Sequence, residues 1–267
     1  MDVKTACVII PTYNEAGNLQ NVLDLIYENI GKQNLIKVYT LIVDDNSPDG
    51  TGRLADEYSR RNKEVKVLHR AAKEGLGAAY IAGMQHALQE LRPDVILEMD
   101  ADLSHNPKDI LRLIRAIEDG ADVVIGSRYV EGGSIPEQWG FYRRLNSSTA
   151  NALVRYVLGL GAKDCTGGFR AIRSSYLEHV DFTRLKTKGY AFQISLLNAL
   201  TSLGADIREV PIHFSDRTVG TSKMRLKDQV DFIMTTFRIR AARDAAVMPM
   251  RNVTATPSAA RRAKKRV

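Results

Sequence analysis

VILEMDADLSH, residues 95–105, is the stretch of sequence that decides the fold. An apolar run ends abruptly in two carboxylates, Asp100 and Asp102, and such a run bounded by polar residues predicts a buried β-strand. Ligands bind at the carboxyl ends of the strands in open parallel sheets, so a strand that ends in paired acids predicts a site at that edge. An Asp-x-Asp pattern by itself is better interpreted as two solvated acids in a loop. The prediction of a binding site therefore depends on other motifs in the chain.

The spacing of Asp100 and Asp102 suits a divalent cation. Residues i and i+2 share one face of an extended strand, and a strand end can direct both side chains toward one hard cation. Two carboxylates together with phosphate oxygens are the usual ligands of Mg²⁺ or Mn²⁺. His105 is a conceivable further ligand, although a hydrogen-bonding loop histidine is the better interpretation.

Strands and helices alternate along the first half of the chain. Apolar runs at residues 6–10, 38–43, 65–68, 95–99 and 122–125 predict five strands, and helical spacing lies between them. The alternation predicts an α/β fold with a mainly parallel central sheet flanked by helices, in which one half is a Rossmann-like nucleotide-binding unit. PTYNE, DDNSPDG and DADLSH each follow a strand, and a parallel sheet brings such loops together at one edge.

The second half of the chain is less regular. Helices are predicted at residues 143–158, 192–203 and 226–240, and strands in KDCTGGFRAI and at residues 207–212. The helix at residues 226–240 is amphipathic, and two interpretations of it are about equally supported. Its apolar side lies against the core, or it lies at a membrane surface. That side consists of Leu226, Val230, Ile233 and Phe237.

Length, composition and charge indicate one large globular domain with a basic tail. The chain has 267 residues, of which 44% are hydrophobic and 26% charged, and no apolar stretch approaches the roughly 18 residues of a membrane-spanning helix. Two cysteines, Cys7 and Cys165, favour free thiols and a reducing compartment. We expect a domain over residues 1–247 and a disordered tail over residues 248–267.

The net charge of +7 is concentrated near the end of the chain. Residues 241–267 hold seven Arg or Lys and one acid, Asp244, so the remainder is nearly neutral. Such a tail can meet anionic lipid, nucleic acid or nothing specific. No stacking or zinc motif accompanies it, so we do not expect nucleic-acid binding.

The motifs PTYNE, DDNSPDG, DADLSHNP, GSRY, TGGFR and RTVGTSK occur in the order found in one known family. Together they resemble the inverting glycosyltransferases of family 2, which have the GT-A fold, and among these the dolichol-phosphate (polyprenol-phosphate) mannosyltransferases. The resemblance covers residues 6–240. It implies transfer of mannose from GDP-mannose to dolichyl or polyprenyl phosphate, giving the lipid-linked mannose donor for protein glycosylation and GPI-anchor synthesis. The alternatives are a UDP-glucose-dependent enzyme, another family 2 glycosyltransferase, or a non-catalytic nucleotide-sugar sensor.

The resemblance assigns the nucleoside to the first two loops. Pro11, Tyr13 and Glu15 would form the floor and the hydrogen-bonding edge for base and ribose, which suits flat apolar rings and an accepting carboxylate. The alternative for these residues is a helix start. Ile42 and Asp44 would also contact the nucleoside, whereas Asp45 is a less certain ligand in a loop that also forms a turn.

The resemblance assigns the diphosphate and the metal to the third loop. Asp100, Ala101 and Asp102 would meet Mg²⁺ or Mn²⁺ and the diphosphate, and Asp102 would act in catalysis. Some family members hold the metal with a Gln at the position occupied here by Ser104, which is a weaker ligand that water can replace.

Basic residues would serve the phosphates. The resemblance implies phosphate binding and a catalytic role for Arg128 in GSRY, and phosphate binding for Arg217 and Lys223 in a loop that could move over the substrate. Arg143 and Arg144 could serve an acceptor phosphate. The alternative for all five is a solvated surface.

The predicted base position lacks a carboxylate. Within YAFQIS, residues 190–195, the polar residue at that position is Gln193, where transfer to a hydroxyl would need a base. A phosphate monoester has a second pKa of about 6 and is already largely ionised near neutral pH, so it needs no base. This favours a lipid phosphate as acceptor, although Gln193 is equally a plain helix residue.

A lipid acceptor implies contact with a membrane. The resemblance implies a peripheral protein on the cytoplasmic face of the endoplasmic reticulum membrane, or on the cytoplasmic membrane in a prokaryote. The helix at residues 226–240, the basic tail, or small membrane-protein subunits would provide the contact.

Overall fold

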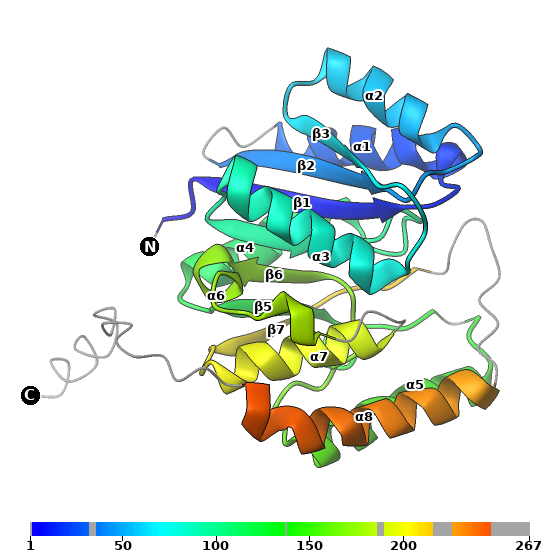
Figure 1. Ribbon diagram of the computed structural model, residues 1–267, viewed down its shortest axis with the longest axis vertical. Helices are drawn as coiled ribbons and strands as arrows, with labels where there is room; N and C mark the ends of the chain where they lie inside the picture. The colour runs from blue at the N-terminus through cyan, green and yellow to red at the C-terminus, as the bar shows by residue number, and fades with distance from the viewer. Residues whose placement is uncertain (1, 32–35, 137, 186–189, 216–225, 247–267) are drawn as a thin grey trace, which may run out of the picture.

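The computed structural model describes residues 2–31, 36–136, 138–185, 190–215 and 226–246. Arg217, Lys223 and the tail at residues 248–267 lie outside the described residues. Seven strands form one sheet in the order β3-β2-β1-β4-β6-β5-β7, with helices on both faces (Figure 1). The strands are β1 (Thr5–Thr12), β2 (Lys37–Asp44), β3 (Val65–His69), β4 (Val95–Glu98), β5 (Val123–Ser127), β6 (Arg170–Arg173) and β7 (Ile207–Pro211).

The sheet is mainly parallel, as the alternation of strands and helices predicts. β1 pairs in parallel with β2 and β4, β2 with β3, and β5 with β7. The exception is β6, which lies antiparallel between β4 and β5 and places Arg170 opposite Glu98. A strand from the second half of the chain therefore separates two strands that are consecutive in the first half.

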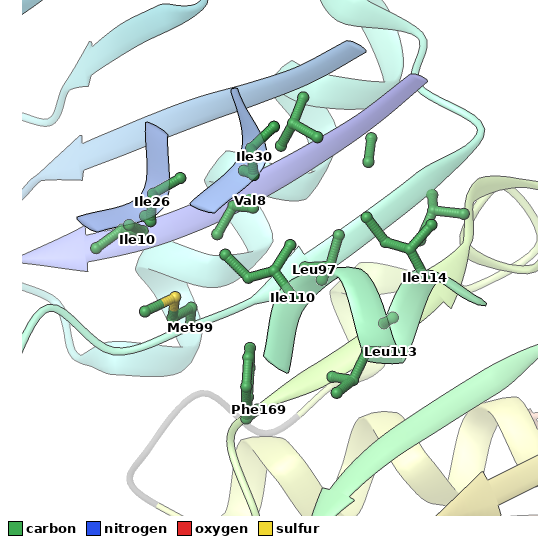
Figure 2. Close-up of a cluster of buried hydrophobic side chains, with 14 of the residues drawn as sticks. Val8, Ile10, Ile26, Ile30, Leu97, Met99, Ile110, Leu113, Ile114 and Phe169 are labelled. Atoms are coloured by element: carbon green, nitrogen blue, oxygen red, sulfur yellow. The ribbon is translucent and has the colours of Figure 1, made fainter. Parts of the chain in front are cut away.

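Two apolar layers hold the helices against the sheet. α1 (Ala16–Ile30), α2 (Thr51–Arg61) and α4 (Ile110–Glu118) lie on one side, and α3 (Leu76–His86) and α7 (Tyr190–Ser202) on the other. Figure 2 shows how the first layer is built, with Ile26 and Ile110 from the helices meeting Val8 and Leu97 from the strands. Side chains of successive residues on a strand belong to opposite apolar layers because they point to opposite faces of the sheet.

Short elements complete the described chain. They are a π-helical turn at Ala87–Leu91, 3-10 turns at Pro107–Asp109 and Phe182–Arg184, and α6 (Ser174–Leu177). Elements this short carry no periodic pattern, so the sequence analysis did not predict α6 or the 3-10 turn at Phe182–Arg184.

α5 (Phe141–Leu158) and α8 (Leu226–Ala246) lie side by side beyond the β7 end of the sheet (Figure 1). α8 buries Phe232, Thr236 and Ile239, whereas Val230 and Phe237 are 57% and 50% exposed. The interpretation in which the apolar side defined by Val230, Ile233 and Phe237 lies against the core is therefore wrong, because the helix buries a different side. No helix within the described ranges is long and apolar enough to cross a bilayer.

Candidate active site

The three loops singled out in the sequence meet at the carboxyl edge of the sheet. β1 and β2 end in register, Thr12 beside Asp44, and the Asp45 N–H donates to the Thr12 carbonyl at 3.0 Å. On the other side of β1, the Met99 N–H donates to the Ile9 carbonyl at 3.1 Å, which brings the third loop alongside. The prediction that strand ends gather these loops at one edge is confirmed.

The first loop combines an exposed ring with a helix start. Pro11 is part of β1, and Tyr13 is 37% exposed with Nζ of Lys73 3.7 Å from its ring centroid. Glu15 immediately precedes α1, its N–H donates to Oγ1 of Thr51, and its Oε2 accepts from Asn18 at 2.8 Å. The helix-start interpretation of Glu15 thus describes its contacts here, and nucleoside binding by this loop stays a prediction.

The second loop holds its acids by internal hydrogen bonds. The buried carboxylate of Asp44 accepts from Oγ1 of Thr12 at 3.2 Å and from Oγ of Ser47 at 2.5 Å. A Cβ on Gly52 would lie 2.8 Å from Oδ2 of Asp44, so a glycine lets α2 approach this closely. Ile42 is fully buried in the core layer beneath the loop, and contact of Ile42 and Asp44 with a nucleoside stays a prediction.

The neighbouring acid, Asp45, is paired with a cation. Nη1 of Arg70 donates to its Oδ1 at 2.5 Å, and Arg70 also bonds Glu74. Burial raises the pKa of Asp45, although the positive charge of Arg70 opposes that shift. Asp45 therefore joins the second loop to the segment that precedes α3.

The third loop presents its two acids differently. The side chain of Asp100 is 28% exposed, and Oη of Tyr80 donates to its Oδ1 at 3.3 Å. Asp102 is buried, and its Oδ1 accepts the Ser104 N–H at 3.0 Å. Ala101 between them is buried as well. One carboxylate thus reaches the surface of the edge, while the other is fixed by the turn.

His105 serves as a hydrogen-bonding loop residue, as expected. Its Nδ1 accepts the Asp100 N–H at 3.1 Å, which assigns the proton of the neutral ring to Nε2. Burial lowers the pKa of His105, so the neutral form is favoured. The ring stacks on Phe169 with centroids 5.0 Å apart, and this fixes the backbone that carries Asp100.

The residues of the third loop fit Mg²⁺ or Mn²⁺. Among the described residues there is no group of three or more His, Cys, Asp or Glu side chains that could hold a metal, so the protein would contribute the two carboxylates. Oγ of Ser104 is buried without a hydrogen-bond partner in the described part of the chain, beside Asp102. Oxygen ligands from two acids, phosphates and water satisfy a hard cation, and the unpaired hydroxyl is available to a ligand or water.

Arg128 follows β5 and is held by an acid that the sequence analysis missed. Its Nε and Nη2 donate to the two carboxylate oxygens of Asp164, both at 2.7 Å, and Nη2 also donates to Thr166. Burial alone would raise the pKa of Asp164, but the hydrogen bonds and charge of Arg128 lower it. The sequence shows Asp164 as an acid within KDCTGG, but no local sequence pattern indicates that it pairs with Arg128.

We predict that Arg128→Lys lowers kcat/KM about 100-fold, because Lys keeps the charge but cannot form the two parallel bonds to Asp164 that orient it. Steady-state kinetics with the nucleotide-sugar donor that the resemblance implies test this. Arg155→Lys, an exposed arginine on α5, is the matched control. Equal kinetics of Arg128→Lys and wild type would contradict the role of the oriented guanidinium.

A buried polar cluster lies directly beneath Asp100. Glu98 is fully buried, and neither carboxylate oxygen has a hydrogen-bond partner in the described structure. Arg170, opposite it on β6, donates to the carbonyls of Gln193 and Cys165, both at 2.7 Å. Arg170 therefore joins β6, the turn before Thr166 and the first part of α7. Glu98 was visible in the sequence as an acid inside an apolar run.

The start of α5 is connected to the third loop through aromatic rings. Arg143 lies over Trp139 at 3.9 Å, Trp139 meets Phe214 edge-on at 5.9 Å, and Phe214 meets His105 at 5.5 Å. Arg144 donates to the carbonyls of Trp139 and Pro136. Both arginines predicted to serve an acceptor phosphate are thus positioned near the same edge.

The fold and this edge define a class of protein, the GT-A nucleotide-sugar transferases. The chain belongs to glycosyltransferase family 2, whose model, "Glycosyl transferase family 2", matches residues 7–181. It is 45% identical over 218 residues to the polyprenol monophosphomannose synthase of Mycolicibacterium smegmatis, covering 81% of this chain and 80% of the relative. It is 43% identical over 216 residues to the undecaprenyl-phosphate mannosyltransferase of Micrococcus luteus, covering 81% and 86%.

Solved structures share the fold. A glucosyl-3-phosphoglycerate synthase from Mycobacterium tuberculosis in complex with Mn²⁺, UDP-glucose and glycerol 3-phosphate superimposes with a TM-score of 0.63 at 18% identity, covering 92% of this chain and 82% of that one. The mannosyl-3-phosphoglycerate synthase of Rubrobacter xylanophilus gives 0.64 at 18% identity, covering 93% and 77%. The predicted GT-A fold is confirmed.

Proposed function

We propose that this protein transfers mannose from GDP-mannose to dolichyl or polyprenyl phosphate, with inversion at the anomeric carbon. The observation that carries the proposal is the identity of 45% and 43% to two bacterial enzymes of this type, each over 81% of the chain. The edge that holds Asp100, Asp102 and Arg128 supplies the chemistry that such a transfer needs.

The donor would lie across the three loops. The exposed ring of Tyr13 offers a stacking surface for the base, with Lys73 beside it. Asp100 and Asp102 would hold Mg²⁺ or Mn²⁺ against the diphosphate. When bound, the cation supplies charge neutralisation to the departing GDP. Hydrogen bonds within this loop join Asp102 to the Ser104 N–H and His105 to the Asp100 N–H, so both acids are positioned by the loop's own contacts.

The acceptor would arrive already ionised. A phosphate oxygen of the lipid attacks C1 of mannose, the bond from C1 to the GDP oxygen breaks, and GDP leaves with the electron pair. No proton has to be removed, which agrees with Gln193 rather than an acid near the start of α7. Arg128, oriented by Asp164, and Arg143 and Arg144 would balance the negative charges of the two substrates.

The acceptor would also determine where the protein works. A polyprenyl phosphate stays in a bilayer, so we propose peripheral contact with a membrane surface. Both relatives come from bacteria, which favours the cytoplasmic membrane of a prokaryote over the endoplasmic reticulum.

We predict that the purified full chain, supplied with Mn²⁺ and polyprenyl phosphate, turns over GDP-mannose and gives a β-linked mannosyl phosphate. UDP-glucose should react at least about 100-fold more slowly, because the wrong base and sugar leave polar groups unpaired. Radiolabelled product extracted into organic solvent measures both reactions. Turnover of UDP-glucose alone would favour the glucosyl alternative, and tight GDP-mannose binding without turnover would favour a sensor.

A further inference from the structure

The carboxylate of Asp100 receives a hydrogen bond from a helix that no sequence motif connects to it. Tyr80 of α3 is fully buried, and its Oη donates to Oδ1 of Asp100 at 3.3 Å. A buried tyrosine hydroxyl needs a hydrogen-bond partner, and a core carbonyl would serve as well. Here the partner is instead the acid of the third loop that reaches the surface, so the bond acts on the candidate site.

The ring of Tyr80 is held by α7. It stacks on Phe192 with the ring centroids 5.6 Å apart and the ring planes 5° apart, and both residues belong to the same apolar layer. The first turn of α7 is held in turn by Arg170, which donates to the Gln193 carbonyl at 2.7 Å. The place of the Tyr80 hydroxyl is therefore determined by the packing of two helices on the sheet.

A glycine determines how close α3 lies to the sheet. Gly83 follows Tyr80 by three residues, so the two positions share one face of α3. A Cβ on Gly83 would lie 2.7 Å from Cγ2 of Ile9 on β1, which is closer than two carbon atoms can pack. The absence of a side chain at Gly83 thus brings α3 near enough to the sheet for the hydroxyl of Tyr80 to meet Asp100.

The contacts around Asp100 make its two carboxylate oxygens unequal. Tyr80 donates to Oδ1, whereas Nδ1 of His105 lies 4.0 Å from Oδ2. That nitrogen accepts the Asp100 N–H, so it carries no proton to donate to Oδ2. An ionised carboxylate has about four lone-pair positions, and one hydrogen bond from a phenol leaves room for a cation. The hydroxyl of Tyr80 therefore restricts the rotation of the carboxylate without occupying all of its acceptor positions.

We propose that Tyr80 is a positioning residue for the divalent cation, because its hydroxyl orients the carboxylate of Asp100 before the cation binds. The inference rests on the assignment of metal and diphosphate in the proposed function, and deepens it by naming a residue outside the motifs. A carboxylate that is already oriented loses less rotational freedom when it binds a ligand. Hydrogen-bond partners of metal-binding side chains are typically worth about 10- to 100-fold in metal affinity.

The test is Tyr80→Phe in the full chain, which removes the hydroxyl and keeps the ring that stacks on Phe192. Calorimetric titration with GDP, with and without Mn²⁺, should show GDP–Mn²⁺ affinity reduced about tenfold or more. The affinity for GDP without metal should equal that of wild type. Tyr58→Phe is the matched control, because it removes a phenol that donates to Asp24 at 2.9 Å between α2 and α1. It should leave both affinities unchanged.

The outcomes separate this inference from the proposed function. Unchanged GDP–Mn²⁺ affinity in Tyr80→Phe would overturn the inference. So would an equal loss of affinity with and without Mn²⁺, because the hydroxyl would then only support the packing of α3. Binding of GDP to wild type that does not respond to Mn²⁺ or Mg²⁺ would overturn the metal assignment together with the inference. A selective loss of metal-dependent binding, in a protein whose wild type transfers no mannose, would instead overturn the proposed function and support the role of Tyr80.

Discussion

Asp102→Asn is expected to lower kcat about 1000-fold while the protein keeps its fold. The amide has the shape of the carboxylate and its oxygen can still accept the Ser104 N–H, so the turn survives. The negative charge that would hold the cation at the diphosphate is lost, and charge stabilisation at a departing group is worth factors of this size. Initial rates at saturating GDP-mannose and polyprenyl phosphate, over a Mn²⁺ titration, measure the effect.

Binding measurements locate the cause of that loss. Calorimetric titration of GDP with Mn²⁺ should show weakened binding to Asp102→Asn, and GDP without metal should bind much as it does to wild type. Asp119→Asn, which neutralises an exposed acid at the end of α4, is the matched control. Unchanged turnover and unchanged GDP–Mn²⁺ affinity in Asp102→Asn would remove the assignment of this residue to the metal and diphosphate.

Arg170→Met is expected to lower the free energy of unfolding by about 3–5 kcal/mol. The change removes the cation that faces Glu98 across the β4–β6 pair, so the buried acid has to take up a proton to remain in the core. It also removes the donors to the carbonyls of Cys165 and Gln193. Urea denaturation at neutral pH measures the change. Arg208→Met, on exposed β7, breaks a surface ion pair and should cost no more than about 1 kcal/mol.

The pH dependence of stability provides the companion measurement. Burial raises the pKa of Glu98 from 4.5 to about 7, although Arg170 and its positive charge oppose the shift. The folded protein therefore holds a proton that the unfolded chain releases, so the free energy of unfolding should fall as the pH rises from about 5 through about 7. Glu98→Gln should remove this slope. A slope that persists in Glu98→Gln would contradict the assignment to Glu98.

The local pattern of apolar and polar residues was sufficient to predict most of the fold. Each segment predicted as a strand became one, from residues 6–10 in β1 to residues 207–212 in β7. The central strands β1, β2, β4 and β5 read as apolar runs because they are buried on both faces. The alternation of strands and helices determined the parallel direction and therefore the shared edge. Asp100 and Asp102 could be placed there from the sequence because they directly follow a strand.

The tertiary structure alone decided which side chains meet. Arg128 and Asp164 are 36 residues apart, and the antiparallel insertion of β6 sets Arg170 opposite Glu98. The periodicity of α8 identified an amphipathic helix but not which side is buried, because Phe232 and Ile239 form an apolar stripe as well. Sequence therefore determined the elements and the edge at which the site lies, since both follow from neighbours along the chain. Ion pairs and buried helix faces depend on the packing of distant segments, which only the folded chain determines.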